Sequence, residues 1–62
     1  MKRRDLLKHL RLYECRLIRE GDEHSIWENP STKYRTSIPR HREILDYTIE
    51  KICKQLGIPL PS

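Results

Sequence analysis

The chain has 62 residues, enough for one domain, and a domain of this size typically buries only about 60% of the surface that its unfolded chain exposes. There is no apolar run of about 18 residues, and the first segment, MKRRDLLKHLRLY, alternates charge with leucine, so we expect a soluble cytoplasmic protein with neither a membrane span nor a secretory leader. Thirteen basic against nine acidic side chains give a net charge of +4, which favours an anionic partner, with nucleic acid as the first candidate.

Leucines at helical spacing predict a first helix that begins at Lys2 or Arg3 and ends at Tyr13. Its apolar side would be formed by Leu6, Leu7, Leu10 and Tyr13. The period then changes to two over residues 15–20, which predicts a strand with one face buried and the other partly exposed. Gly21 ends this strand.

Two further strands are predicted after Gly21. The segment from His24 to Trp27 has the β-branched and aromatic content of a strand, and the short connection before it suits a hairpin. Residues 29–32 form the next turn, because Asn before Pro favours an extended residue that enters a turn. A third strand over residues 34–38 ends at Pro39, which cannot donate a ladder hydrogen bond. Three strands with short turns imply an antiparallel meander.

Apolar residues at helical spacing predict a second helix near the end of the chain: Leu45, Ile49, Ile52 and Leu56. Asp46 is its expected N-cap, and Gly57 followed by Ile58 predicts a helix stop of the Schellman type. The order α-β-β-β-α predicts an α+β fold with two helices on one face of a three-stranded antiparallel sheet, the other face being left for solvent or a ligand. We expect one domain over residues 1–62, with a loose tail over residues 60–62.

Three histidines are the main candidates for chemistry. His9 lies on the first helix away from the leucines, and we expect it to be solvated. His24 stands where a turn meets a strand, a position from which a side chain can reach a ligand while the sheet holds it in place. His41 lies between Arg40 and Arg42 in the loop after the third strand, a setting that attracts phosphate.

The basic side chains divide into a helix set and a loop set. Charges on a helix face are usually only solvated, and this set contains Lys2, Arg3, Arg4, Lys8 and Arg11. The loop set is the sharper hypothesis for phosphate binding and contains Lys33, Arg35, Arg40 and Arg42. The possible metal ligands lack the short paired spacings of a metal site, so we expect none from Cys15, His24, His41 and Cys53. The two cysteines are expected to be reduced, packed thiols, since they form no CxxC unit.

Short segments along nearly the whole chain carry a family resemblance. They are KRRDLL at the start, CRLIREG leading to His24 and an aromatic strand, Pro39-Arg40-His41, and ICKQLGI near the end. In this order and spacing they resemble the HicA toxins of bacterial and archaeal toxin-antitoxin modules, which are small messenger-RNA-cleaving proteins with a double-stranded-RNA-binding-domain-like fold. The resemblance implies that His24, in a Gly-x-x-His motif, is the catalytic residue and that a HicB-type antitoxin binds over the site.

Chemistry at such a site needs little from the protein, because RNA carries its own nucleophile in the 2′-hydroxyl group. A group that moves a proton, donors that stabilise the phosphorane charge and in-line geometry are sufficient, so we expect neither a metal nor a small-molecule cofactor. We predict His24 as general acid or base, with the phosphate contacted by Arg40, His41 and Arg42 and by Lys33 and Arg35. Asp22 and Glu23 stand where the family has small or neutral polar residues, and carboxylates repel phosphate. The alternative is therefore an RNA-binding module of the same fold that cleaves weakly or not at all.

Overall fold

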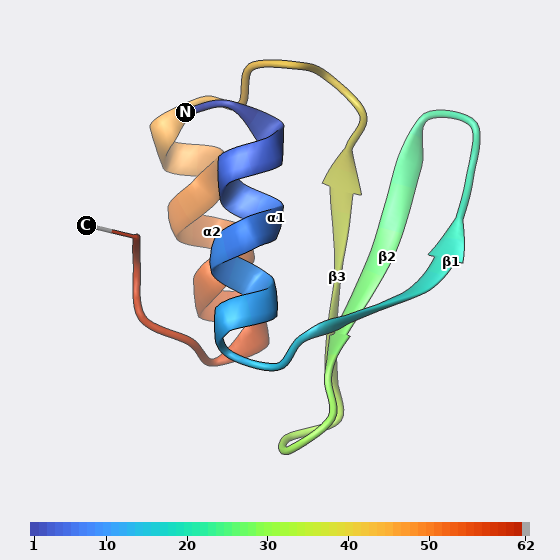
Figure 1. The fold of residues 1–62 in the computed structure, drawn as a ribbon, viewed down its shortest axis with the longest axis vertical. Coiled ribbons are helices and arrows are strands. Elements are labelled where there is room, and N and C mark those ends of the chain that lie inside the picture. Colours follow the sequence, from blue (N-terminus) through green and yellow to red (C-terminus); the bar gives the residue numbers. More distant parts are fainter. Residues whose placement is uncertain (62) are drawn as a thin grey trace.

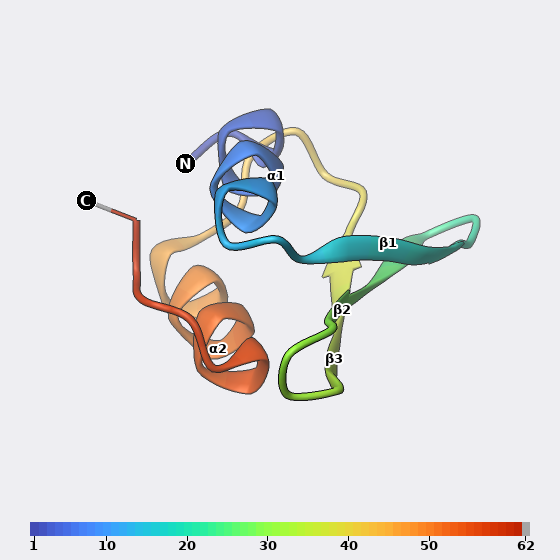
Figure 2. The same cartoon turned by 60° about the horizontal axis from the view of Figure 1, so that its bottom comes forward.

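A computed structural model describes residues 1–61, and Ser62, with the part of the predicted loose tail that falls on it, lies outside the described residues. The elements are α1 (Arg3–Leu12), β1 (Arg16–Glu20), β2 (His24–Asn29), β3 (Tyr34–Pro39) and α2 (Asp46–Leu56). The strands form one antiparallel sheet in the order β1-β2-β3, and both helices lie on the same side of it (Figures 1 and 2). The predicted α+β fold is confirmed. Neither helix in the described range is long and apolar enough to cross a membrane.

The core lies between the helix pair and the sheet. Leucines on one side of α1 pack here, and α2 contributes Ile49, Ile52, Cys53 and Leu56. The sheet adds Trp27 and Ile38, which are 2% and 0% exposed. Each fully buried side chain of this size stabilises the fold by roughly 1.5–3 kcal/mol. The apolar residues recur at helical spacing because each helix packs one side against the sheet.

The helix α2 ends as predicted but begins differently. Gly57 has a left-handed φ of 71°, its N–H donates to the carbonyl of Lys54, and the next N–H donates to the carbonyl of Cys53, which is the predicted Schellman motif. The prediction of Asp46 as N-cap is wrong. Leu45 holds the extended N-cap position, and Asp46 is the first helical residue, where its charge still favours the helix dipole.

The edge strand β1 has no buried face, contrary to the prediction. All five of its residues are exposed, and Leu17 and Ile18 are 44% and 39% exposed. Its pairing with β2 shifts register between Leu17 and Arg19, and such a bulge breaks the simple alternation of faces. Only Cys15, just before the strand, reaches the core, because β1 extends beyond the two helices (Figure 2).

The topology gives the sheet two different ends. The β1–β2 turn and the loop from β3 to α2 lie at one end, together with the start of α1, and the β2–β3 turn lies at the other (Figure 1). We call the first the loop end and define it by residues 1–4, 20–24 and 39–44. His24 pairs with Pro39 at this end, and Asn29 pairs with Tyr34 at the opposite end. The two ends of β2 are about 17 Å apart at the usual rise per residue of a strand.

Candidate functional site

The turn that joins β1 to β2 carries His24 at the loop end. The N–H of Gly21 donates to the carbonyl oxygen of His24 over 2.8 Å, which closes the turn around Asp22 and Glu23. A Cβ atom at position 21 would lie only 2.8 Å from that same oxygen, closer than real Cβ contacts. Glycine is therefore required by a close backbone approach, and the glycine and histidine of the Gly-x-x-His segment form one structural unit.

Arg40 holds this turn from the β3 side. Its backbone N–H donates to the carbonyl of Glu23 over 3.1 Å, and its Nη1 donates to the carbonyl of Gly21 over 3.0 Å. The same Nη1 lies 3.6 Å from the carboxylate of Glu20. One residue therefore fixes the turn at both of its ends.

A buried serine beside His24 links α1 to all three strands. Ser25 is fully buried, donates to Oε1 of Glu20 over 2.6 Å and accepts from Nη2 of Arg3 over 2.7 Å. The Nε of Arg3 also donates to the carbonyl of Pro39 over 3.0 Å. Hydrogen bonds with an ionised partner are stronger than those between neutral groups, so this network holds the start of the strand that carries His24 firmly in place.

His24 itself is exposed and lies on the sheet face away from the helices, because alternation puts its buried neighbour on the helix side. Two hollows meet at this side chain. One, of about 450 Å³, is lined by Arg19, Gly21, Asp22, Glu23, His24 and Ile26. The other, of about 340 Å³, is lined by Asp22, Glu23, His24, Pro39, Arg40 and His41. Three of the predicted site residues, His24, Arg40 and His41, thus share one hollow.

Lys33 and Arg35, which the sequence grouped with the loop arginines, lie elsewhere. Lys33 occupies the β2–β3 turn with a φ of 67°, at the end of the sheet opposite to His24. Arg35 pairs with Glu28, four residues along β2 from His24, or about 13 Å at the usual rise per residue. The third strand carries both residues away from the loop end. Arg42 remains in the loop that follows His41.

Glu28 is buried on the open face between two arginines. Its side chain is 5% exposed and lies 2.9 Å from Nε of Arg35 and 3.3 Å from Nη2 of Arg16. The hydrogen bond from Arg35 is the main reason that the pKa of Glu28 lies below its ordinary value, and the bond from Arg16 adds to this effect against the opposing effect of burial. The guanidinium of Arg35 is therefore already engaged within the protein.

His9 does not belong to this site. Its Nε2 lies 2.7 Å from the carbonyl oxygen of Pro59, and its ring packs edge-on against Tyr13 with 5.0 Å between the ring centroids. It is half-buried, so the expectation of a solvated residue is wrong. His9 ties α1 to the segment that follows α2.

The cysteines are free and buried, as predicted. Burial raises the pKa of both thiols, and the nearby Cys15 raises that of Cys53 further. Because they lie in the core while His24 and His41 are exposed, the four residues considered as metal ligands do not come together. Across residues 1–61 no group of three or more His, Cys, Asp or Glu side chains is arranged to hold a metal.

Sequence reasoning missed four residues around the site: Arg3, Arg19, Glu20 and Ser25. The sequence grouped Arg3 with the solvated helix charges, and it gave Arg19, Glu20 and Ser25 no role in a site. One signal was present. Ser25 is a polar residue at the first position of β2 that faces the helices, and a buried hydroxyl needs a partner.

These features define a small α+β protein in which two helices cover one face of an antiparallel meander and a glycine-closed turn presents one histidine beside basic residues. A family model described as the HicA toxin of bacterial toxin-antitoxin systems matches residues 3–58. The chain therefore belongs to the HicA toxin family, as the sequence resemblance indicated, and is a toxin of the kind that is paired with an antitoxin. No curated protein and no solved structure matches the chain.

Proposed function

We propose that the protein is an endoribonuclease that cleaves messenger RNA, and thereby inhibits translation and growth, with His24 as general acid or base. The observation that carries this proposal is the placement of His24. His24 is exposed and shares a hollow with Arg40 and His41. The turn before it is closely packed, because it leaves no space for a Cβ atom at Gly21. An imidazole and cationic hydrogen-bond donors around one hollow are what phosphodiester cleavage by proton transfer requires.

The proposed reaction begins with attack of the ribose 2′-hydroxyl on the adjacent phosphorus. His24 either takes the proton from this hydroxyl, with water protonating the departing 5′ oxygen, or protonates that oxygen, with water taking the hydroxyl proton. The products are a 2′,3′-cyclic phosphate and a 5′-hydroxyl end, and such proton transfer typically accelerates a reaction by about 10²- to 10⁴-fold. Arg40 donates from the guanidinium N–H groups that the turn does not use, since a guanidinium has several donors in a fixed fork. His41 and Arg42 complete the proposed phosphate contacts. The substrate supplies the nucleophile, so the mechanism uses neither a metal nor a cofactor.

The test is cleavage by a His24→Ala variant that circular dichroism shows to be folded. We expect the rate constant for RNA cleavage to fall by about 10²- to 10⁴-fold. A His9→Ala variant is the matched control, since it removes an imidazole outside the loop end. Cleavage by His24→Ala at the wild-type rate would contradict the assignment, and cleavage of a substrate with 2′-deoxyribose at the cut position would contradict the 2′-hydroxyl route.

The second candidate is an RNA-binding module that cleaves weakly or not at all. The acidic turn favours it, because Asp22 and Glu23 line both hollows that contain His24, where a phosphate must arrive. Induced expression separates the two functions, since an active nuclease inhibits growth and His24→Ala relieves the inhibition. Replacing the carboxylates with amides, Asp22→Asn with Glu23→Gln, should raise kcat/KM for RNA if these charges repel the substrate.

We further propose that a HicB-type antitoxin protein binds over the loop end and blocks access to His24. The exposed Leu17 and Ile18 on β1 offer apolar surface on the strand that leads into this end. Adding such a partner should abolish RNA cleavage and protect these residues from solvent in hydrogen exchange. A partner that binds while cleavage continues would place the antitoxin elsewhere.

A further inference from the structure

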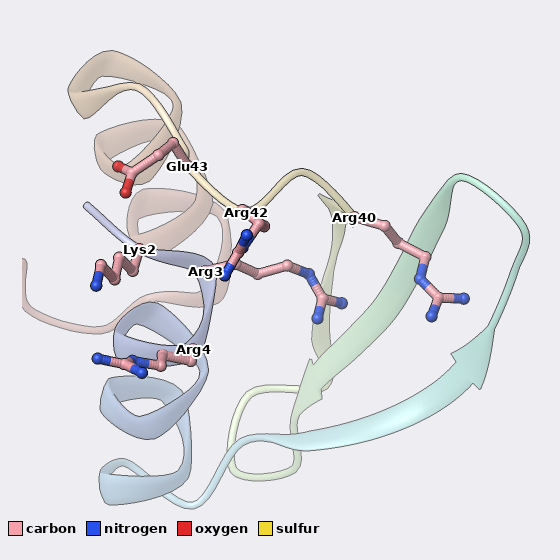
Figure 3. A pocket seen from close by; sticks show the side chains of 6 residues that line it. All are labelled: Lys2, Arg3, Arg4, Arg40, Arg42 and Glu43. Carbon is pink, nitrogen blue, oxygen red and sulfur yellow. The ribbon is translucent and has the colours of Figure 1, made fainter.

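A third hollow at the loop end is lined by cations that the proposed reaction leaves largely unused. It has a volume of about 480 Å³ and lies between the start of α1 and the loop that precedes α2 (Figure 3). Five basic side chains and one carboxylate line it: Lys2, Arg3, Arg4, Arg40, Arg42 and Glu43. We call it the basic cleft.

The walls of the basic cleft are joined by backbone hydrogen bonds between distant parts of the chain. The N–H of Arg3 donates to the carbonyl of Arg42 over 2.7 Å, and the N–H of Ile44 donates to the carbonyl of Met1 over 2.9 Å. Between these bonds Lys2 and Glu43 form an isolated antiparallel bridge. The fold therefore holds like charges close together at fixed positions, an arrangement that attracts anions.

The cleft retains charges that the protein does not neutralise. Arg3 and Arg40 point toward the sheet (Figure 3), where Arg3 donates to the carbonyl of Pro39 and Arg40 donates to the carbonyl of Gly21. Among residues 1–61, neither Lys2 nor Arg42 forms an ion pair. Arg4 forms an ion pair with its neighbour Asp5 at 3.7 Å, and its side chain is 78% exposed.

The carboxylate of Glu43, which lines the cleft, is engaged by the terminal amine. The Oε2 of Glu43 lies 3.6 Å from the terminal amine of Met1. Lys2 and Arg4 are therefore the groups available to a second anion, beside Arg42, which the proposed reaction already uses.

The basic cleft continues from the hollow that contains His24, because Arg40 lines both. An RNA strand whose scissile phosphate lies at His24 would pass Arg40 and bring a neighbouring phosphate into the cleft. We propose that the basic cleft binds this second backbone phosphate and so holds the RNA strand on one side of the cut. This inference rests on the proposed function. A guanidinium suits the role because its fork matches two phosphate oxygens.

The experiment measures RNA binding without cleavage, in His24→Ala protein, by fluorescence anisotropy of a labelled single-stranded RNA at several salt concentrations. The test variant is Lys2→Ala with Arg4→Ala. The matched control is Lys51→Ala with Lys54→Ala, which removes the same charge from exposed positions on α2 that line a different hollow. Circular dichroism checks that both double variants are folded.

We expect the test variant to bind RNA about tenfold more weakly at low salt, while the control changes by less than about twofold. The slope of log K against log salt should become shallower by about 0.7, since each phosphate neutralised on a single strand contributes about 0.7 and the cleft binds one. Equal losses in the two double variants would overturn the basic cleft while leaving RNA binding intact.

The remaining outcomes separate this inference from the proposed function. Loss of RNA binding confined to the test variant, in a protein whose wild-type form cuts no RNA, would support the cleft and contradict the nuclease. No binding of RNA by the parent His24→Ala protein, together with no cleavage by the wild type, would overturn both. A polyglutamate peptide of equal charge that displaces the RNA as well as unlabelled RNA does would assign the cleft to a protein partner and overturn the RNA assignment.

Discussion

A methyl group added by Gly21→Ala tests whether the turn sets the position of His24. The new Cβ would lie 2.8 Å from the carbonyl oxygen of His24, whereas ordinary contacts begin at 3.4 Å. The two groups must therefore move apart by about 0.6 Å. The same oxygen accepts the hydrogen bond that closes the turn, so this bond weakens as the strand start moves, at a cost of about 0.5–1.5 kcal/mol in the free energy of unfolding.

The effect on catalysis should exceed the effect on stability. A displacement of about 1 Å at a reacting group can lower a rate about 10²-fold, so we expect Gly21→Ala to lower kcat for RNA cleavage roughly tenfold or more. The midpoint of thermal unfolding should fall by only about 5 °C, since about 1 kcal/mol corresponds to 4–8 °C in a domain of this size. Cleavage is measured in single-turnover reactions well below the unfolding temperature, and the midpoint is measured by circular dichroism during heating.

The control for Gly21→Ala is Asp22→Ala in the same turn, because position 22 already carries a Cβ atom. We expect this control to keep the wild-type midpoint of thermal unfolding. A Gly21→Ala protein with wild-type kcat and wild-type thermal stability would refute the reasoning, because it would show that the turn absorbs the methyl group without moving His24.

Three further predictions concern the buried polar groups and thiols. Ser25→Ala leaves Nη2 of Arg3 without its serine partner and should lower the free energy of unfolding in urea by about 1–3 kcal/mol; an unchanged value would show that the network does not stabilise the loop end. The pKa of Glu28 is lower in the folded protein than in the unfolded chain, so its carboxylate stabilises the fold at pH values above the unfolded pKa. This contribution is lost as the pH falls through the folded pKa. Glu28→Gln should therefore flatten the acid side of a plot of thermal midpoint against pH. Burial and raised pKa values should keep Cys15 and Cys53 unreactive toward a thiol reagent at neutral pH until denaturant is added, and rapid labelling of the folded protein would contradict this.

The helices were predictable from their leucine and isoleucine spacing because each packs one side against the same sheet. The exposure of β1 was not predictable in the same way. Alternation over residues 15–20 shows that side chains change face, but it does not show whether a helix covers that part of the sheet. The two helices cover the sheet without reaching along β1, so Leu17 and Ile18 remain exposed.

The site was predictable only where its residues are neighbours in sequence. His24 follows its turn directly, and His41 lies beside Arg40. Arg3 joins the site through partners that are 22 and 36 residues away, so no local pattern could reveal it. The separation of Lys33 from the loop arginines has the same origin, because residues that are close in sequence lie at opposite ends of β3.

The double hold of Arg40 on the turn has a consequence for the entropy of binding. A free arginine side chain loses up to about 2 kcal/mol of rotamer freedom when a ligand immobilises it. The contacts of Arg40 with Gly21 and Glu20 have already ordered its guanidinium during folding. Binding of a phosphate therefore causes little further loss of conformational entropy at Arg40, and the affinity is correspondingly higher.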